Sequence, residues 1–280
     1  MKSLVLGTLA VLGACGPGDR GGGGKSPDAA GSGSADAPVS APTSRLYAHS
    51  GNKLYQIDTA TLAPVEVGTM AGLGPQSLTD LAIDKDDKFT GITLDKLYSL
   101  DATTGAATLI RDLSASARGF TSLSYVPVDL SDPNSTDILI AANSTGDVFE
   151  IDAATGNATM LGSYGMVASG RVGSSGDLIG VRGLGIYATV NIGTDPTAQD
   201  YLARIDPTTW TATPLGIGTG FNDIFGLGYW QGTIYGFVSS STSTGSMITI
   251  DPNTGAGAEV NAGAIRWFGA GVATDAPILQ

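Results

Sequence analysis

The sequence predicts an all-β fold: a five-bladed β-propeller with four antiparallel strands per blade, its ring closed by the C-terminal strand joining the N-terminal blade. The main observation is a motif of Ile or Leu, Asp, two variable residues and Thr that occurs five times. Its aspartates are Asp58, Asp101, Asp152, Asp206 and Asp251, at steps of 43, 51, 54 and 45 residues. Repeats of about 40–50 residues built from short strands are typical of β-propellers. The apolar strands around each copy and an unpaired strand pattern at the C-terminus predict the same fold.

The strand that leads into each aspartate carries apolar side chains on both faces. Apolar residues occupy the fourth, third and first positions before the Asp, as Leu54, Tyr55 and Ile57 do in the first copy. Side chains alternate between the two faces of a strand, so this pattern predicts a strand that is covered on both sides. A propeller blade is covered in this way because it lies between two neighbouring blades.

Short apolar segments around the motif predict the other strands of each blade. We expect second strands at residues 46–48, 89–92, 138–141, 186–189 and 234–237. We expect inner strands at residues 81–83, 123–125, 178–180 and 224–227, and a fourth strand after each motif. The first repeat lacks an inner strand, whereas residues 267–272 have the inner-strand pattern with no strands after them. The two ends are therefore expected to share one blade, which removes exposed sheet edges.

The pattern Asp-x-x-Thr-Gly after each strand predicts a hairpin turn. An Asp side chain accepts backbone N–H groups two residues on, and Gly tolerates the positive φ of such turns. A metal-binding loop or a repeated active-site Asp is the alternative interpretation, but a turn accounts for every copy. Two copies have Leu62 and Trp210 in place of the Gly.

The N-terminus predicts export and lipid anchoring. Residues 1–14 form a signal peptide, because the apolar run at residues 4–14 follows a positive charge and is too short for a membrane-spanning helix. The run ends in Leu-Gly-Ala before Cys15, which resembles a bacterial lipobox and implies lipidation of Cys15. An incidental small residue in the signal peptide is the alternative. The resemblance implies a bacterial cell-envelope lipoprotein, and the Gly after Cys15 favours the outer membrane.

The remaining domain boundaries follow from composition. Residues 15–43 contain the lipidated Cys and a linker rich in Gly, Ser, Pro and Ala, which is expected to be disordered because it has almost no apolar surface to bury. Residues 44–280 form the propeller domain, expected to be a monomer. It has no second cysteine, so packing alone must stabilise it.

Composition excludes several classes of partner and reaction. The formal net charge of −12 argues against nucleic acid and against an anionic lipid surface, so membrane contact is expected only through the lipid anchor. His49 is the single histidine, which excludes a multi-histidine zinc site and leaves one base for a Ser-His-Asp triad. The three glutamates lie on expected third or outer strands, away from the inner strands where a glycosidase acid is expected.

Three aspartates at the expected starts of inner strands form the candidate metal site. Asp80, Asp177 and Asp223 stand at these places, and carboxylates grouped around an axis could coordinate a hard cation such as Ca²⁺. Direct contact with a ligand is a second interpretation. The third interpretation is purely structural: the aspartates accept backbone N–H groups of the next blade or pair with arginines in the same connections, namely Arg118, Arg171 and Arg266. No other cofactor is expected.

Aromatic residues near the same strands are candidates for binding a sugar or a peptide. Tyr229, Trp230 and Trp267 are the candidates, with Phe221 and Phe225 nearby. Aromatic side chains also fill the core between blades, which is the alternative for each of them.

The repeats resemble two known propeller families. Residues 57–61, followed by Val67 and Gly68, resemble the YVTN-type repeat of bacterial and archaeal surface propellers. The Leu-Tyr-x-Leu/Ile-Asp-x-x-Thr-Gly form also resembles quinoprotein-type repeats. These resemblances imply a surface propeller, and no residues match a catalytic motif of either family.

The sequence therefore favours a membrane-anchored, non-enzymatic β-propeller that serves as a binding or scaffold module for an envelope protein, a peptide or a glycan. The alternative is a hydrolase or lyase with an Asp-based, Ca²⁺-assisted site at the axial face. A module with no small ligand is a third hypothesis.

Overall fold

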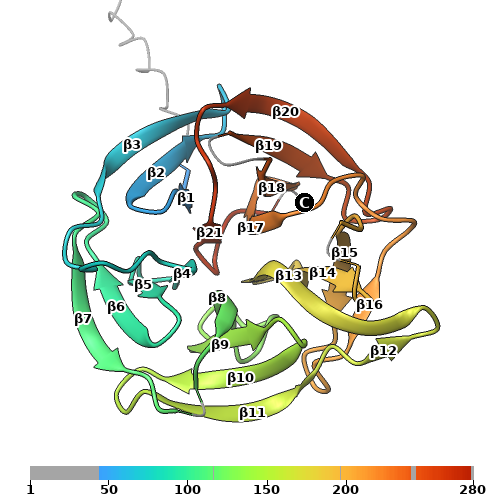
Figure 1. Cartoon of the computed structure of the whole chain (residues 1–280), viewed down its shortest axis with the longest axis horizontal. Coiled ribbons are helices and arrows are strands. Elements are labelled where there is room, and N and C mark those ends of the chain that lie inside the picture. Colours follow the sequence, from blue (N-terminus) through green and yellow to red (C-terminus); the bar gives the residue numbers. More distant parts are fainter. Residues whose placement is uncertain (1–43, 116, 196, 241–243, 279–280) are drawn as a thin grey trace, which may run out of the picture. The chain divides into compact units, whose positions relative to one another are not determined.

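The computed structural model describes residues 44–278, apart from residues 116, 196 and 241–243. The expected signal peptide (1–14), Cys15 and the linker (15–43) lie outside the described residues. Five antiparallel sheets surround a central axis, which confirms the predicted five-bladed propeller (Figure 1). Within the part of the chain that is described, no helix is long and apolar enough to cross a membrane.

Four blades are four-stranded. The first, built from both ends of the chain, has the order β21 (Gly269–Val272), β1 (Leu46–His49), β2 (Lys53–Asp58), β3 (Ala63–Thr69). The second is β4 (Asp80–Ile83), β5 (Phe89–Ile92), β6 (Lys96–Leu100), β7 (Ala107–Asp112). The third is β8 (Phe120–Pro127), β9 (Asp137–Asn143), β10 (Asp147–Asp152), β11 (Asn157–Ser163). The fifth is β17 (Ile224–Trp230), β18 (Thr233–Ser239), β19 (Gly245–Ile250), β20 (Gly257–Gly263).

The fourth blade differs from the others by one short additional strand. Its order is β12 (Met166–Val167), β13 (Gly170–Val181), β14 (Gly185–Ile192), β15 (Tyr201–Ile205), β16 (Ala212–Pro214). The β12 strand pairs with the first two residues of β13, so it extends a long hairpin at the start of the inner strand.

The ring closes as predicted. Strand β21 pairs antiparallel with β1, from Leu46 opposite Val272 to His49 opposite Gly269. The N-terminal strand therefore has a hydrogen-bonded neighbour on each side, since β2 pairs with its other edge. Both ends of the ring are joined within one sheet, and no free edge remains at the closure.

Packing between inner strands forms the centre of the molecule. The leucines Leu81, Leu123, Leu178 and Leu227 are at most 2% exposed and lie on the inner strands of four successive blades. Larger side chains fill the wedge between blades farther out, as Phe237 and Trp267 do between the fifth blade and the first. Removing such apolar surface from water is the main stabilising contribution to a ring without disulfides.

The five motif aspartates form turns. In each copy Oδ1 of the Asp accepts two backbone N–H groups, two and three residues on, at 2.7–3.3 Å. The hydrogen bond from the Thr103 hydroxyl (2.6 Å), together with those from the Thr103 and Thr104 backbone N–H groups, lowers the pKa of Asp101 to about 2. The Gly position has positive φ in every copy, including 57° at Leu62 and 61° at Trp210. The turn interpretation of the motif is confirmed.

Replacing Gly105 by Ala is expected to lower the free energy of unfolding by about 1–2 kcal/mol, because a Cβ is strained in the left-handed region. Gly105 has a φ of 74°, and a Cβ there would lie 3.1 Å from the Gly68 carbonyl oxygen. Denaturant unfolding measures the change. Gly105→Asn is the matched control and should lose less, since Asn adopts this conformation more readily; equal losses would point to crowding instead of backbone strain.

Candidate functional site: the axial mouth and the polar core beneath it

A hollow opens at one end of the propeller axis, and we call it the axial mouth. It is lined by Ser77, Leu78, Thr79, Leu94, Thr121, Ser175, Gly176, Phe225 and Phe268. Most of these residues come just before or at the start of an inner strand, so all five blades contribute to it. Its volume is about 360 Å³, and Leu94 at its edge is 61% exposed. The mouth is thus an open, largely apolar site with hydroxyl groups around it.

Two buried carboxylates lie on inner strands, Asp80 as the first residue of β4 and Asp177 well inside β13, next to residues that line the mouth. Asp80 accepts the N–H of Leu81 at Oδ1 (2.8 Å) and that of Leu123, in the next blade, at Oδ2 (2.7 Å). Asp177 repeats the arrangement with Leu178 (2.6 Å) and Leu227 (2.6 Å). Each carboxylate therefore joins its own inner strand to that of the following blade, and both side chains are 0% exposed.

The two carboxyl groups also lie close enough for each to affect the ionisation of the other. Burial is the largest cause that raises the pKa of Asp80 well above its ordinary value, and the charge of Asp177 adds to it. Burial likewise raises the pKa of Asp177, while its hydrogen bonds oppose the rise. Both carboxyl groups are therefore harder to ionise than free ones, which favours retention of a proton by the pair.

His49 belongs to the same polar core. Its Nδ1 lies 2.8 Å from the Ser50 carbonyl oxygen, which can only accept, so Nδ1 carries the proton. Its Nε2 is buried and has no hydrogen-bond partner among the described residues. A Cβ added to Gly269 would lie 2.5 Å from both this Nε2 and Asp80 Oδ1. Glycine at this position therefore makes room for the imidazole and the carboxyl group side by side.

The buried histidine predicts a loss of stability in acid. Burial lowers the pKa of His49 to about 4, so the folded protein excludes a proton that the unfolded chain binds below its ordinary pKa of 6.5. The contribution of His49 to stability is complete above pH 6.5. As the pH falls towards 4, this contribution is lost, which lowers the free energy of unfolding by about 3 kcal/mol. The raised pKa values of Asp80 and Asp177 act in the opposite direction, so a variant must isolate the effect of His49.

His49→Asn provides this comparison, because its amide can still donate to the Ser50 carbonyl. We expect the wild-type free energy of unfolding to fall by about 3 kcal/mol more than that of the variant between pH 7 and pH 4. Denaturant unfolding at each pH measures both curves. Parallel curves would show that His49 does not exclude a proton in the folded state.

The third aspartate of the predicted group lies elsewhere. Asp223 is in the connection before β17, where it has a φ of 55°. The position in the fifth blade that matches Asp80 and Asp177 belongs to Gly226, directly before Leu227. Asp200, which the sequence did not single out, is buried instead and accepts the Ile224 N–H at 2.9 Å. Burial raises the pKa of Asp200 to about 6.

The described residues offer little for a metal ion. Among them, no group of three or more His, Cys, Asp or Glu side chains could hold one. The oxygens of Asp80 and Asp177 already accept inner-strand N–H groups. Two of the three arginines expected near these carboxylates bind elsewhere: Arg171 pairs with Asp147 at 2.8 Å, and Arg266 donates to the Ser239 hydroxyl at 2.9 Å.

The candidate aromatic residues lie in the core between blades. Tyr229 and Trp230 end β17, away from the mouth, and are 3% and 4% exposed. Trp267 makes edge-to-face contacts with Tyr55 and Phe237, with ring centroids 5.5 and 5.3 Å apart. The structure therefore does not bring the three candidates together at one surface.

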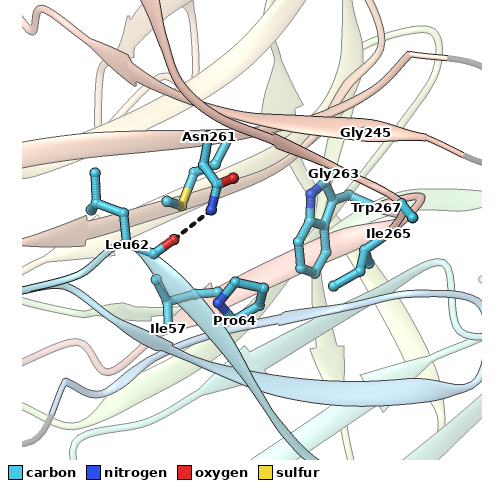
Figure 2. A pocket seen from close by; sticks show the side chains of 10 residues that line it. Ile57, Leu62, Pro64, Gly245, Asn261, Gly263, Ile265 and Trp267 are labelled. Atoms are coloured by element: carbon cyan, nitrogen blue, oxygen red, sulfur yellow. Dashed lines mark hydrogen bonds between the residues drawn. The ribbon is translucent and has the colours of Figure 1, made fainter.

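Trp267 lines a small hollow between the first and fifth blades. Figure 2 shows its ring facing Ile265 and Pro64, with Asn261 Nδ2 donating to the Leu62 carbonyl at 2.7 Å. The volume is about 100 Å³, which suits one small apolar group at most. The hydrogen bond ties β20 to the turn of the first blade, so this hollow is part of the ring closure.

Comparison with known proteins finds similarity in fold but not in sequence family. No known family and no curated protein sequence matches the chain. Among solved structures, it is similar to a symmetrical protein of de novo evolutionary emergence, with a TM-score of 0.48 and 14% identity over 84% of this chain and 99% of that one. It is also similar to a TolB-like protein from Agrobacterium tumefaciens, with a TM-score of 0.45 and 14% identity over 81% and 80% of the two chains.

A protein of unknown function from Bacteroides thetaiotaomicron is similar at a TM-score of 0.45 and 12% identity, over 68% of this chain and 52% of that one. Similarities at this level do not indicate which ligand this chain binds or where in the cell it is located. The fold and site define the chain as a five-bladed β-propeller with an open axial mouth. The resemblance to YVTN-type and quinoprotein-type repeats stays a prediction.

Proposed function

We propose that the chain is a binding module of the bacterial cell envelope, whose axial mouth takes a peptide, a glycan or a segment of an envelope protein. The axial mouth carries the proposal. Its volume of about 360 Å³ is within the usual range for a ligand pocket, and apolar groups with a few polar ones line it. A concave apolar surface in contact with water favours a partner that covers it.

The state of the buried carboxylates supports binding over catalysis. Asp80 and Asp177 are 0% exposed, and their oxygens accept backbone N–H groups. A carboxylate that acts on a substrate needs an oxygen within hydrogen-bonding reach of it. The pair beneath the mouth is therefore better suited to holding inner strands together than to hydrolysis.

A thermal-shift screen tests the proposal, using the full-length chain with panels of peptides, oligosaccharides and divalent cations. A ligand of the mouth should raise the melting temperature of the wild type but not that of Leu94→Asp, which places a charge at the edge of the mouth. Leu109→Asp is the matched control, because Leu109 is 49% exposed but lies on the outer strand β7. A shift that survives Leu94→Asp, or no shift with any compound, would contradict the proposal.

We further propose that Cys15 anchors the protein to the membrane, with the outer membrane favoured. The Leu-Gly-Ala sequence before Cys15 supports this. Cys15→Ser should abolish labelling by a fatty-acid analogue and move the protein from the detergent phase to the aqueous phase on phase partitioning. Two or three acyl chains give lasting attachment, so the change should be nearly complete. Unchanged partitioning would show that another segment holds the protein to the membrane.

A further inference from the structure

Arg266 is a cation without an acidic partner next to the axial mouth. The chain has 26 acidic and 14 basic residues, an excess that favours pairing of every cation. Among the described residues, ion pairs are made by Arg45, Lys53, Lys85, Lys96, Arg171 and Arg182, but not by Lys88, Arg111, Arg118, Arg204 or Arg266. No described carboxylate lies within ion-pair distance of Arg266, although its side chain is only partly exposed.

The guanidinium group of Arg266 is held in place on two sides. Its Nε donates to the Ser239 hydroxyl at 2.9 Å, and its central carbon lies 4.8 Å from the centroid of the Phe268 ring. The described residues give no hydrogen-bond partner to its two terminal nitrogens. Those nitrogens form the fork that binds a carboxylate in two parallel hydrogen bonds. Because the group is already stacked and hydrogen-bonded, less entropy is lost when an anion binds.

The hollow around Arg266 adjoins the axial mouth. It has a volume of about 390 Å³ and is lined by Ser50, Gly51, Asn52, Tyr55, Ala264, Ile265, Arg266 and Phe268. Phe268 also lines the mouth, so its ring lies between the apolar site and the cation. Asp223 is the acid on the neighbouring connection: its carbonyl oxygen accepts the Ser239 N–H at 3.0 Å, and its carboxylate makes no ion pair with Arg266.

We propose that the mouth and the Arg266 hollow together bind the free carboxyl terminus of a peptide or protein chain whose last side chain is apolar. The inference rests on the proposed function of the mouth and names the partner of that site. In a C-terminal residue, the carboxylate and the side chain are attached to the same Cα. A site that binds both must therefore have its anion-binding group and its apolar pocket only about one side chain apart. Arg266 and the mouth, separated by the Phe268 ring, meet this requirement.

The polar groups of the Arg266 hollow fit the same partner. Ser50 and Asn52 bring a hydroxyl and an amide close to where the last peptide units would lie. The net charge of −12 gives no general attraction for anions, so a carboxylate would be bound by this local contact. The side chain of Leu94 and the rings of Phe225 and Phe268 would surround the terminal apolar group.

An array of immobilised peptides with free C-termini tests the proposal. The peptides end in Leu, Phe, Val, Ser or Asp, and a second array carries the same peptides with amidated ends. The labelled full-length wild type, Arg266→Met, Leu94→Asp and Arg204→Met are applied to both, and hits are measured again in solution by fluorescence anisotropy. Arg266→Met keeps the aliphatic stem on Phe268 and removes the charge. Arg204→Met is the matched control, because Arg204 also stacks on a ring, that of Tyr187 at 5.6 Å, but lines neither hollow.

We expect the wild type and Arg204→Met to bind free-ended peptides that finish in Leu, Phe or Val. Amidation, or Arg266→Met, should weaken binding by about 10- to 100-fold, the effect of losing a charge-assisted hydrogen-bonded pair. Equal binding of free and amidated peptides, lost in Leu94→Asp but kept in Arg266→Met, would overturn this inference and leave the mouth as a binding site. The inference would also be overturned if no peptide bound, or if neither Arg266→Met nor Leu94→Asp affected binding. Ligands from the thermal-shift screen would then test the proposed function of the mouth separately.

Discussion

Arg182→Ala is expected to lower the free energy of unfolding by about 3–5 kcal/mol, because it leaves a buried carboxylate without its cation. Arg182 Nη2 lies 2.6 Å from Asp137 Oδ1, and the two side chains are 8% and 4% exposed. The same nitrogen donates to the Ser135 carbonyl at 2.6 Å, and the Thr274 hydroxyl accepts from Nη1. The alanine variant would remove all of these hydrogen bonds at once.

The cost is large because the ion pair joins several blades. Arg182 follows the inner strand of the fourth blade, and Asp137 begins the second strand of the third. Asp137 Oδ2 also accepts the Thr274 hydroxyl at 2.7 Å and the Lys85 N–H at 3.0 Å, from the first and second blades. Loss of the cation thus affects a contact point shared by four of the five blades.

Arg171→Ala is the matched control for this variant. Arg171 also pairs with an aspartate, Asp147, but the two side chains are 53% and 26% exposed. Solvent screens such a pair, so a loss of about 0–1 kcal/mol is expected. Both variants are compared by denaturant unfolding at neutral pH. Equal losses would show that the Arg182 pair is effectively solvated and that the ring does not depend on it.

Asp80→Ala is expected to cost about 2–6 kcal/mol, since it leaves two buried N–H groups without an acceptor at about 1–3 kcal/mol each. The groups are those of Leu81 and Leu123, on the inner strands of adjacent blades. Ser122 occupies the matching place in the third blade and accepts one N–H, from Ala142 at 3.1 Å. Ser122→Ala is therefore the matched control, with a loss about half as large.

The cost of Asp80→Ala should also depend on pH. The raised pKa of Asp80 means that the folded state keeps a proton that the unfolded chain releases above its ordinary pKa of 3.8. The stabilising contribution of the pair is thus complete below that pH and decreases as the pH rises through the raised value. The difference between wild type and variant should be greatest near pH 4 and shrink towards neutral pH. A difference that grows with pH would show that both carboxylates are ionised in the folded ring.

The blade architecture could be predicted because its causes are local. Each Ile/Leu-Asp-x-x-Thr segment encodes a strand and the turn that ends it, since the Asp side chain satisfies N–H groups only two and three residues away. Even Leu62 and Trp210, which replace the expected Gly, keep the same turn with a positive φ. The closure by β21 could be predicted because a strand pattern without partners stood at each end of the domain.

The candidate site could be predicted only in part. The sequence predicted Asp80, Asp177 and Asp223 at the starts of inner strands. In the structure Asp80 begins β4 and Asp223 directly precedes β17, whereas Asp177 lies well inside β13. The position of the fifth blade that matches Asp80 and Asp177 is Gly226. Irregular pairing shifts the register along the inner strands β8, β13 and β17, and no composition pattern reveals how far each one shifts. Leu94 was missed because a single exposed leucine in a connection has no pattern that marks it as part of a mouth.

The sequence by itself determined the class of fold, the number of blades, the turns and the expectation of a lipid-anchored envelope protein, since each depends on neighbours along the chain. Only the tertiary structure decided that Asp80 and Asp177 interact, that His49 lies beside Asp80, and that Arg266 stacks on Phe268 without a described acidic partner. These residues come from different blades, and their distances depend on how the inner strands pack around the axis. Packing of this kind sets burial, and burial sets the charge state and the partners of each polar group.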